Sequence, residues 1–165
     1  HGRRMRLGTE MNWTDGPVSV KSEFIRVSEE RGNAGIAMQD LPDLISRGWY
    51  LAGTWVMSGE KKSETVRPRK DFLSGGGLGA VEVAARYDVL AFGSGGTGVP
   101  SRSPRAPNVL ANSDRALTFG VNWYWNRFMK LQINGIRETL EDPQTVPVPG
   151  KNRYWTTVVR LQFHM

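Results

Sequence analysis

Hydrophobic and polar residues alternate along the chain with the period of two that an extended strand requires. The clearest stretch, residues 117–137, places leucine, phenylalanine, valine and tryptophan on one face and threonine, glycine, asparagine and tyrosine on the other. A polar break at Asn126 and Arg127 divides this stretch into two runs. The pattern predicts an antiparallel hairpin with one apolar and one polar face.

Five further runs repeat this alternation, at residues 5–13, 18–24, 47–58, 81–89 and 155–163. Their lengths resemble the roughly nine to eleven residues of a tilted transmembrane strand. The predicted fold class is therefore all-β: an antiparallel transmembrane β-barrel segment of about seven strands. Residues 1–165 are predicted to form a single domain.

The connections between the runs alternate in length. Residues 14–17 and 126–127 are tight breaks, whereas residues 28–46, 92–113 and 138–152 are long and polar, with a short helical piece expected near 35–45. Outer-membrane barrels have short periplasmic turns and long outer loops, so this alternation favours a barrel. Trp49 and Trp155 then lie at the outer ends of their strands, and Trp13, Trp125 and Phe163 at the inner ends, as two interfacial belts require. Residues 59–77 become an unusually long periplasmic connection.

The composition excludes several kinds of functional site. The chain has 165 residues, a net charge of +6 and no cysteine, so it contains neither disulfides nor thiolate metal sites. Its mean hydropathy is −0.43, and it lacks the run of about 18 apolar residues that a membrane helix needs. The only histidines are His1 and His164, and no catalytic triad spacing or metal-ligand cluster is present. We therefore expect no enzyme activity, no cofactor and no metal.

Basic residues are the candidate functional groups, because a positive charge favours an anionic partner. Six lie on the polar face of the predicted strands: Arg4, Arg6, Lys21, Arg86, Lys130 and Arg160. Five lie in the long connection: Lys61, Lys62, Arg67, Arg69 and Lys70. Guanidinium groups present paired donors to phosphate oxygens, and Arg86 is the favoured strand position. The alternative interpretation is that these cations are solvated or paired with Glu10, Glu23, Glu82 and Asp88.

Several segments together resemble one family. They are Gly48-Trp49-Tyr50 with the strand that follows, residues 79–87, residues 120–126 and the closing strand to Phe163. In order and spacing they resemble the C-terminal portion of the phosphate-selective porins of Gram-negative outer membranes, from about residue 47 to the end. The closing strand is similar to a barrel-assembly signal that ends in an aromatic residue, although His164 and Met165 follow Phe163 here.

The resemblance implies a sixteen-stranded barrel in the outer membrane, assembled as a homotrimer, with a lumen lined by Arg and Lys. It also implies that this chain is the C-terminal part of a longer protein whose remaining strands lie upstream. In that family one long periplasmic connection folds into the pore, and residues 59–77 occupy the matching place. The implied function is passive diffusion of phosphate or related oligoanions, with outer-membrane lipid as a further partner.

Two alternatives stay open at the level of sequence. One is a general diffusion porin without phosphate preference. The other is a soluble basic β-sandwich that binds nucleic acid or acidic glycans, in which tryptophans would lie on the polar face beside Lys and Arg. Only tyrosines such as Tyr50, Tyr124 and Tyr154 lie there, so a nucleic-acid partner is not expected.

Overall fold

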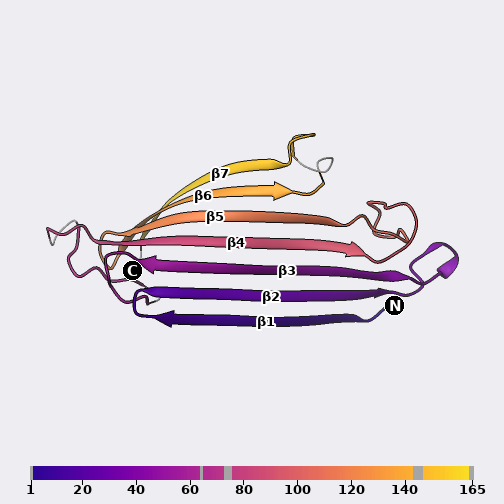
Figure 1. The fold of residues 1–165 in the computed structure, drawn as a ribbon, viewed down its shortest axis with the longest axis horizontal. Helices are drawn as coiled ribbons and strands as arrows, with labels where there is room; N and C mark the ends of the chain where they lie inside the picture. Colours follow the sequence, from indigo (N-terminus) through magenta and orange to yellow (C-terminus); the bar gives the residue numbers. More distant parts are fainter. Residues whose placement is uncertain (1, 64, 73–75, 143–146, 164–165) are drawn as a thin grey trace.

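The computed structural model describes residues 2–63, 65–72, 76–142 and 147–163, and they form one sheet of seven antiparallel strands. The strands are β1 (Arg4–Asp15), β2 (Val18–Arg31), β3 (Leu41–Val56), β4 (Ala80–Ser94), β5 (Asn112–Tyr124), β6 (Met129–Leu140) and β7 (Arg153–Phe163). They follow chain order across the sheet, each hydrogen-bonded to the next (Figure 1). This confirms the predicted all-β, seven-stranded antiparallel segment. The ending at His164 and Met165 lies outside the described residues.

The strands extend beyond the hydrophobic runs that predicted them. β2 reaches Arg31 and β3 already begins at Leu41, so the helical piece expected near 35–45 shrinks to a single 3₁₀ turn at Ile36–Met38. The prediction was wrong over 41–45 because the backbone ladder continues where side chains no longer alternate in polarity. The described part of the chain contains no helix long and apolar enough to cross a membrane.

The two ends of the sheet differ in their connections. At one end, which we call the turn end, Gly16 and Pro17 join β1 to β2, and residues 125–128 join β5 to β6. Gly16 has a φ of +52°, a conformation that glycine adopts without steric cost. The longer connections 32–40, 95–111 and 141–152 lie at the opposite end, the loop end (Figure 1). Residues 57–79 are the exception, since they are long and lie at the turn end.

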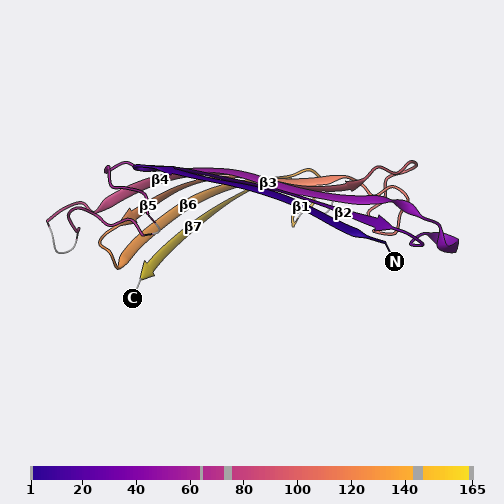
Figure 2. The ribbon, with the colours of Figure 1, turned by 90° about the horizontal axis from the view of Figure 1, so that it is seen from below.

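The sheet is a single layer with free edges at β1 and β7, and Figure 2 shows it edge-on with its strands twisted relative to one another. The apolar side chains therefore have no second sheet to cover them: Val121 is 43% and Val159 65% exposed. A soluble β-sandwich would bury these residues between two sheets. The described fold is the single curved layer that a barrel wall requires.

Aromatic residues mark a line across the apolar face at the turn end. Side chains that are directly paired across the sheet form rows, and Trp13 belongs to the row containing Gly53, Phe119 and Thr157. Other aromatic residues lie closer to the turn end than this row. Trp55 is two residues beyond it on β3, Trp123 is four residues beyond it on β5, and Phe163 is six residues beyond it on β7. This aromatic line thus shifts by one residue per strand. With about 3.3 Å per residue and 4.8 Å between strands, the shift corresponds to a strand tilt of roughly 35°, as in membrane barrels.

Candidate functional site

The described residues of the connection 57–79 fold back over the turn end of the polar face. Its small apolar core contains Val66, which packs with Val56, Ala80 and Tyr124 from three strands. The backbone N–H of Lys62 donates to the carbonyl oxygen of Gly16 at 2.8 Å, and that of Phe72 donates to Trp125 at 2.8 Å. The ring of Phe72 also lies 4.7 Å from that of Trp123. The connection is therefore fixed to the strands at several points.

Gly79 allows the connection to re-enter β4 closely against β5. Its φ is +72°, and a Cβ at this position would lie 2.2 Å from the carbonyl oxygen of Tyr124. Any other residue would be strained by both the backbone conformation and the contact. The tight re-entry places the first residues of β4 under the connection.

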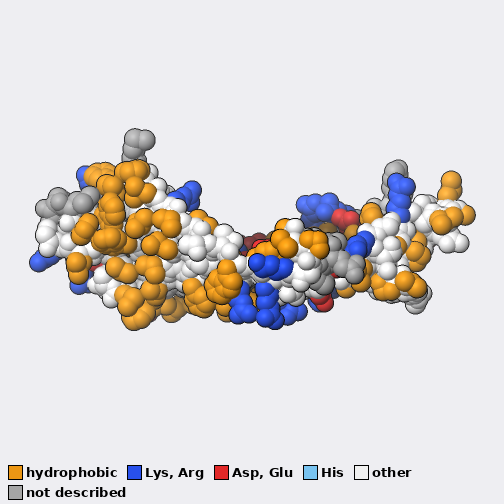
Figure 3. Space-filling model, turned by 90° about the horizontal axis from the view of Figure 1, so that it is seen from above, with side chains coloured by type: hydrophobic (Ala, Val, Ile, Leu, Met, Phe, Trp, Pro, Cys, Tyr) orange, Lys and Arg blue, Asp and Glu red, His pale blue; other side chains and the backbone are white. Residues whose placement is uncertain are grey.

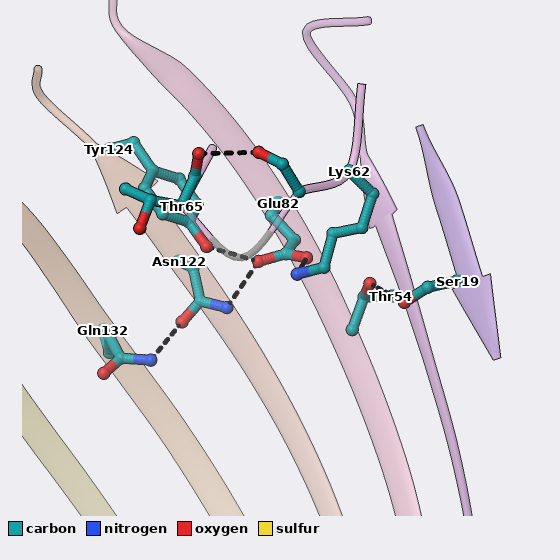
Figure 4. A network of polar contacts seen from close by, with 9 residues as sticks. Ser19, Thr54, Lys62, Thr65, Glu82, Asn122, Tyr124 and Gln132 are labelled. Atoms are coloured by element: carbon teal, nitrogen blue, oxygen red, sulfur yellow. Dashed lines mark hydrogen bonds and ion pairs between the residues drawn. The ribbon is translucent and has the colours of Figure 1, made fainter. Parts of the chain in front are cut away.

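Glu82 organises the polar contacts beneath the connection (Figure 4). Its side chain is fully buried and forms an ion pair with Lys62. The hydroxyl of Tyr124 donates to Oε2 of Glu82 at 2.8 Å, and the amide of Asn122 donates to the same oxygen at 2.9 Å. Asn122 accepts in turn from the amide of Gln132 at 2.7 Å. The carboxylate is thus held by three side chains, one from the connection and two from β5, and Gln132 on β6 orients one of them.

Three of the predicted cations lie near one another at the turn end of the polar face, and we call them the cation cluster: Lys62, Lys130 and Arg160. Lys130 experiences the charges of Glu82, Lys62 and Arg160, and its ammonium lies 5.3 Å from the centre of the Tyr124 ring. Arg160 is paired in the sheet with Gln132. Three cations against one carboxylate leave a local excess of positive charge at the turn end of the polar face.

Other predicted cations have an acidic partner. The guanidinium of Arg86 forms an ion pair with Asp88 at 2.6 Å and stacks on the ring of Tyr50 at 3.8 Å. Arg4 pairs with Glu29 at 2.8 Å. The alternative interpretation named the partners of Arg86 and of Lys62, which are Asp88 and Glu82. It did not name Glu29, the partner of Arg4, while Arg6 and Lys21 are exposed on β1 and β2.

A row of carboxylates crosses the middle of the polar face. Glu10 is paired with Glu23, Glu23 with Tyr50, and Tyr50 with Asp88, and the same row continues through Ala116 to Glu138. We call Glu10, Glu23, Asp88 and Glu138 the acidic row. The polar face is thus mixed in charge along its middle and positive at its turn end.

The remaining cations of the connection are at its surface. Lys61, Arg67 and Lys70 are exposed, and the guanidinium of Arg69 donates to the carbonyl oxygen of Gly59 at 3.1 Å. The backbone N–H of Arg69 donates to Glu60 at 3.3 Å. Burial raises the pKa of Glu60, but hydrogen bonds from Ser58 and from backbone N–H groups, together with the charge of Arg69, lower it more, so the net pKa lies below its usual value. Glu60 is thus a charged anchor for the connection.

Sequence reasoning identified the three cations but not the residues that gather them. Glu82 was assigned only as a possible partner in a general charge balance, and Val66, Asn122 and Gln132 were not singled out. A weak signal existed for Val66, because it is an isolated valine among Lys, Ser, Glu and Arg. The path of a long connection is not encoded in alternation, so its contacts became visible only in three dimensions.

The chain was also compared with known proteins. The sequence model of one protein family, described as phosphate-selective porin O and P, matches residues 1–164. None of the curated proteins compared with the chain matches it. The family match reaches well before residue 47, where the resemblance noted in the sequence began, and so includes β1 and β2.

Proposed function

Because the chain belongs to the phosphate-selective porin O and P family, a family of bacterial outer-membrane porins, we propose that its polar face lines a water-filled pore. In this proposal the cation cluster attracts phosphate or related oligoanions at the turn end. The apolar face contacts outer-membrane lipid of a Gram-negative bacterium. Transport is passive diffusion and involves no covalent chemistry.

The observation that carries the proposal is the fold of residues 57–79 over the polar face. This fold brings Lys62 to Lys130 and Arg160, although the three residues are far apart in the sequence. A connection that covers one end of a pore narrows it there, and charges at a narrow point act through less water than charges in a wide lumen. The turn end is therefore the proposed constriction.

Electrostatics accounts for selectivity at such a constriction. Fixed cations raise the local concentration of anions and replace part of their hydration shell during passage. Glu82 balances one of the three charges and holds Lys62 in place, so the site stays positive without binding an anion too tightly to release it. Arg86 is proposed as a weaker pore-lining site, because Asp88 neutralises it locally.

Closure of the pore needs additional strands. The free edges of β1 and β7 present unpaired backbone groups, which lipid cannot satisfy. We propose that further strands complete the barrel between these edges and that three barrels assemble into a homotrimer, as the family resemblance implies. The remaining predicted cations, Arg4, Arg6, Lys21, Lys61, Arg67, Arg69 and Lys70, contribute a diffuse positive field in this proposal.

The proposal is tested by the reversal potential of the assembled porin in planar bilayers under a salt gradient. Replacing the cation cluster with glutamine (K62Q/K130Q/R160Q) is expected to lower the permeability ratio of anion to cation by roughly tenfold. This corresponds to about 1.4 kcal/mol in total, or about 0.5 kcal/mol for each cation. The matched control is Arg86→Gln, which removes one polar-face cation that already has a carboxylate partner.

The control is expected to lower the same ratio only slightly. If the triple variant keeps the permeability ratio of the unmodified porin, the cation cluster has no role in selectivity. If Arg86→Gln alone produces the larger loss, the constriction lies in the middle of the polar face instead.

A general diffusion porin without phosphate preference is the second candidate, and the acidic row favours it. Carboxylates in the middle of the polar face oppose multiply charged anions. The two candidates differ in the block of chloride current by added phosphate. Block at the turn end that disappears in the triple variant supports phosphate preference, whereas equal currents with and without phosphate support general diffusion.

A further inference from the structure

Within the described strands the apolar face carries five arginines, and all five lie toward the loop end. We call Arg26, Arg47, Arg115, Arg137 and Arg153 the arginine belt. Every one of them is exposed, and within the part of the chain that the structure describes none forms an ion pair or a side-chain hydrogen bond. Figure 3 shows hydrophobic side chains gathered over the turn end, and Lys and Arg side chains gathered from the middle of the molecule onward.

The sheet register places these like charges next to one another. Arg26 is paired directly with Arg47 across β2 and β3. Thr139 is paired with both Arg115 and Arg153, and Arg137 lies two residues from Thr139 on β6, diagonal to both. Directly opposed like charges destabilise a sheet, and diagonal neighbours are only about 7–8 Å apart. The arrangement therefore favours an anion that bridges the guanidinium groups.

The belt lies at one height above the aromatic line. Along their own strands, Arg47 lies eight residues from Trp55 and Arg115 eight residues from Trp123. Because the aromatic line shifts by one residue per strand, it crosses β2 at Ser19 and β6 at Lys130. Arg26 and Arg137 therefore each lie seven residues from the line. At about 3.3 Å per residue and a tilt of roughly 35°, these four lie about 19–22 Å above the line. Arg153 lies ten residues from Phe163 and is therefore higher, at about 27 Å above the line.

This height is close to the apolar band of a membrane barrel, which is about 25 Å tall. The belt thus lies where the hydrocarbon layer gives way to polar headgroups. Neighbouring carboxylates lie farther out: Asp43 accepts a hydrogen bond from Ser28, and Glu30 pairs with Arg3 at 3.3 Å. On this face the remaining strand carboxylate, Asp15, lies at the turn end.

We propose that the arginine belt binds the phosphate groups of lipid headgroups in the outer leaflet. The inference rests on the proposed function for its membrane orientation, in which the apolar face contacts lipid and the loop end faces outward. Guanidinium groups bind phosphate with paired hydrogen bonds. The belt lies on the opposite side of the sheet from the proposed pore, so its phosphate comes from lipid rather than from anions in transit.

The test measures lipid binding to the delipidated, assembled porin in detergent by native mass spectrometry. Phosphatidic acid is the probe, and phosphatidylcholine, whose phosphate is balanced by choline, is the reference lipid. Each cation near an anionic lipid surface strengthens attachment by roughly fivefold. R26Q/R47Q is therefore expected to weaken phosphatidic-acid binding by roughly thirtyfold, and R115Q/R137Q/R153Q by roughly 150-fold. Arg86→Gln, an arginine variant on the polar face, is expected to leave lipid binding unchanged.

Three outcomes contradict the inference. The first is equal retention of phosphatidic acid by the unmodified porin and both belt variants, and the second is an equal loss caused by Arg86→Gln. The third is displacement of the bound lipid by dissolved phosphate. Inorganic phosphate added at millimolar concentration is expected to leave the bound lipid in place, and its displacement would assign the site to dissolved anions instead. The reversal potential of the belt variants is measured in parallel. If the belt variants bind lipid more weakly but keep their anion selectivity, the lipid-binding role of the arginine belt is supported. This result does not depend on whether the cation cluster proves to control selectivity.

Discussion

Two regions of the polar face both contain cations and yet differ in their electrostatics. At the turn end Lys62 pairs with the carboxylate of Glu82, and Lys130 lies within the influence of Glu82, Lys62 and Arg160. In the middle of the face Arg86 forms an ion pair with Asp88, which belongs to the acidic row. The difference shows that a basic residue on the correct face is not sufficient for an anion site. The local balance of charge decides its role, and here a folded connection sets that balance.

The largest expected effect comes from the carboxylate that joins the connection to the sheet. Glu82→Gln removes the partner of Lys62 from a fully buried position, and breaking a buried pair in this way costs about 3 kcal/mol. We expect the connection 57–79 to detach, which is measured as faster hydrogen exchange at the backbone N–H groups of Lys62 and Phe72. Asp88→Asn on the same strand is the control. Exchange that is unchanged in Glu82→Gln contradicts the role of Glu82 as an anchor.

A second variant loosens the connection without changing any charge. Val66→Ala removes two methyl groups from the small core formed with Val56, Ala80 and Tyr124, and we expect a loss of about 2 kcal/mol. Because Lys62 is held by the same connection, anion selectivity is expected to fall together with protection from hydrogen exchange. Loss of protection with full selectivity would separate the connection from the selectivity of the pore.

Asp88→Asn makes the local charge in the middle of the polar face more positive, as it is at the turn end. The substitution frees Arg86 from its partner, and exposed pairs of this kind are worth about 0.2–1 kcal/mol. We expect the permeability ratio of anion to cation to rise by a factor of roughly 1.4 to 5. A ratio that falls or stays constant in planar bilayers would show that Asp88 does not neutralise Arg86 in the pore.

The smallest expected effect is a dependence on pH through Glu60. Its pKa is lowered in the folded protein, so its charged form stabilises the packed connection above the pKa of the unfolded chain, and this contribution is lost as the pH falls through the folded value. Intrinsic-rate-corrected hydrogen exchange of the Arg69 backbone N–H is expected to lose protection below about pH 4.5, the ordinary pKa of a glutamate. Glu60→Gln should lack this part of the pH dependence. An identical pH profile in both proteins would contradict the assignment.

The sequence alone predicted all seven strands, because alternation of polarity directly reflects a sheet with two different faces. It did not predict where β2 ends and β3 begins, since Arg31 and Leu41 lie beyond the alternating region and only backbone pairing defines them. The ion pair of Arg86 with Asp88 was predictable in principle, because residues two apart share a strand face. The pairing of Lys62 with Glu82 was not, because it depends on the path of a long connection.

The arginine belt shows a related limit. The sequence analysis did not single out these arginines, because Arg26, Arg115 and Arg153 lie outside the alternating runs and Arg47 and Arg137 lie at the ends of theirs. Only the register between strands shows that four of them share one height and that Arg153 lies above it. Register depends on long-range pairing, and a single sequence does not contain that information in a readable form.

The central claim is that the polar face meets water while the apolar face meets lipid. The chain has no native cysteine, so single cysteines at two neighbouring residues of β7 test it directly. In the assembled porin in lipid vesicles, a negatively charged, membrane-impermeant thiol reagent is predicted to modify Arg160→Cys and to alter the conductance, while Val159→Cys stays unmodified. Rapid modification of Val159→Cys with protection of Arg160→Cys would contradict the account.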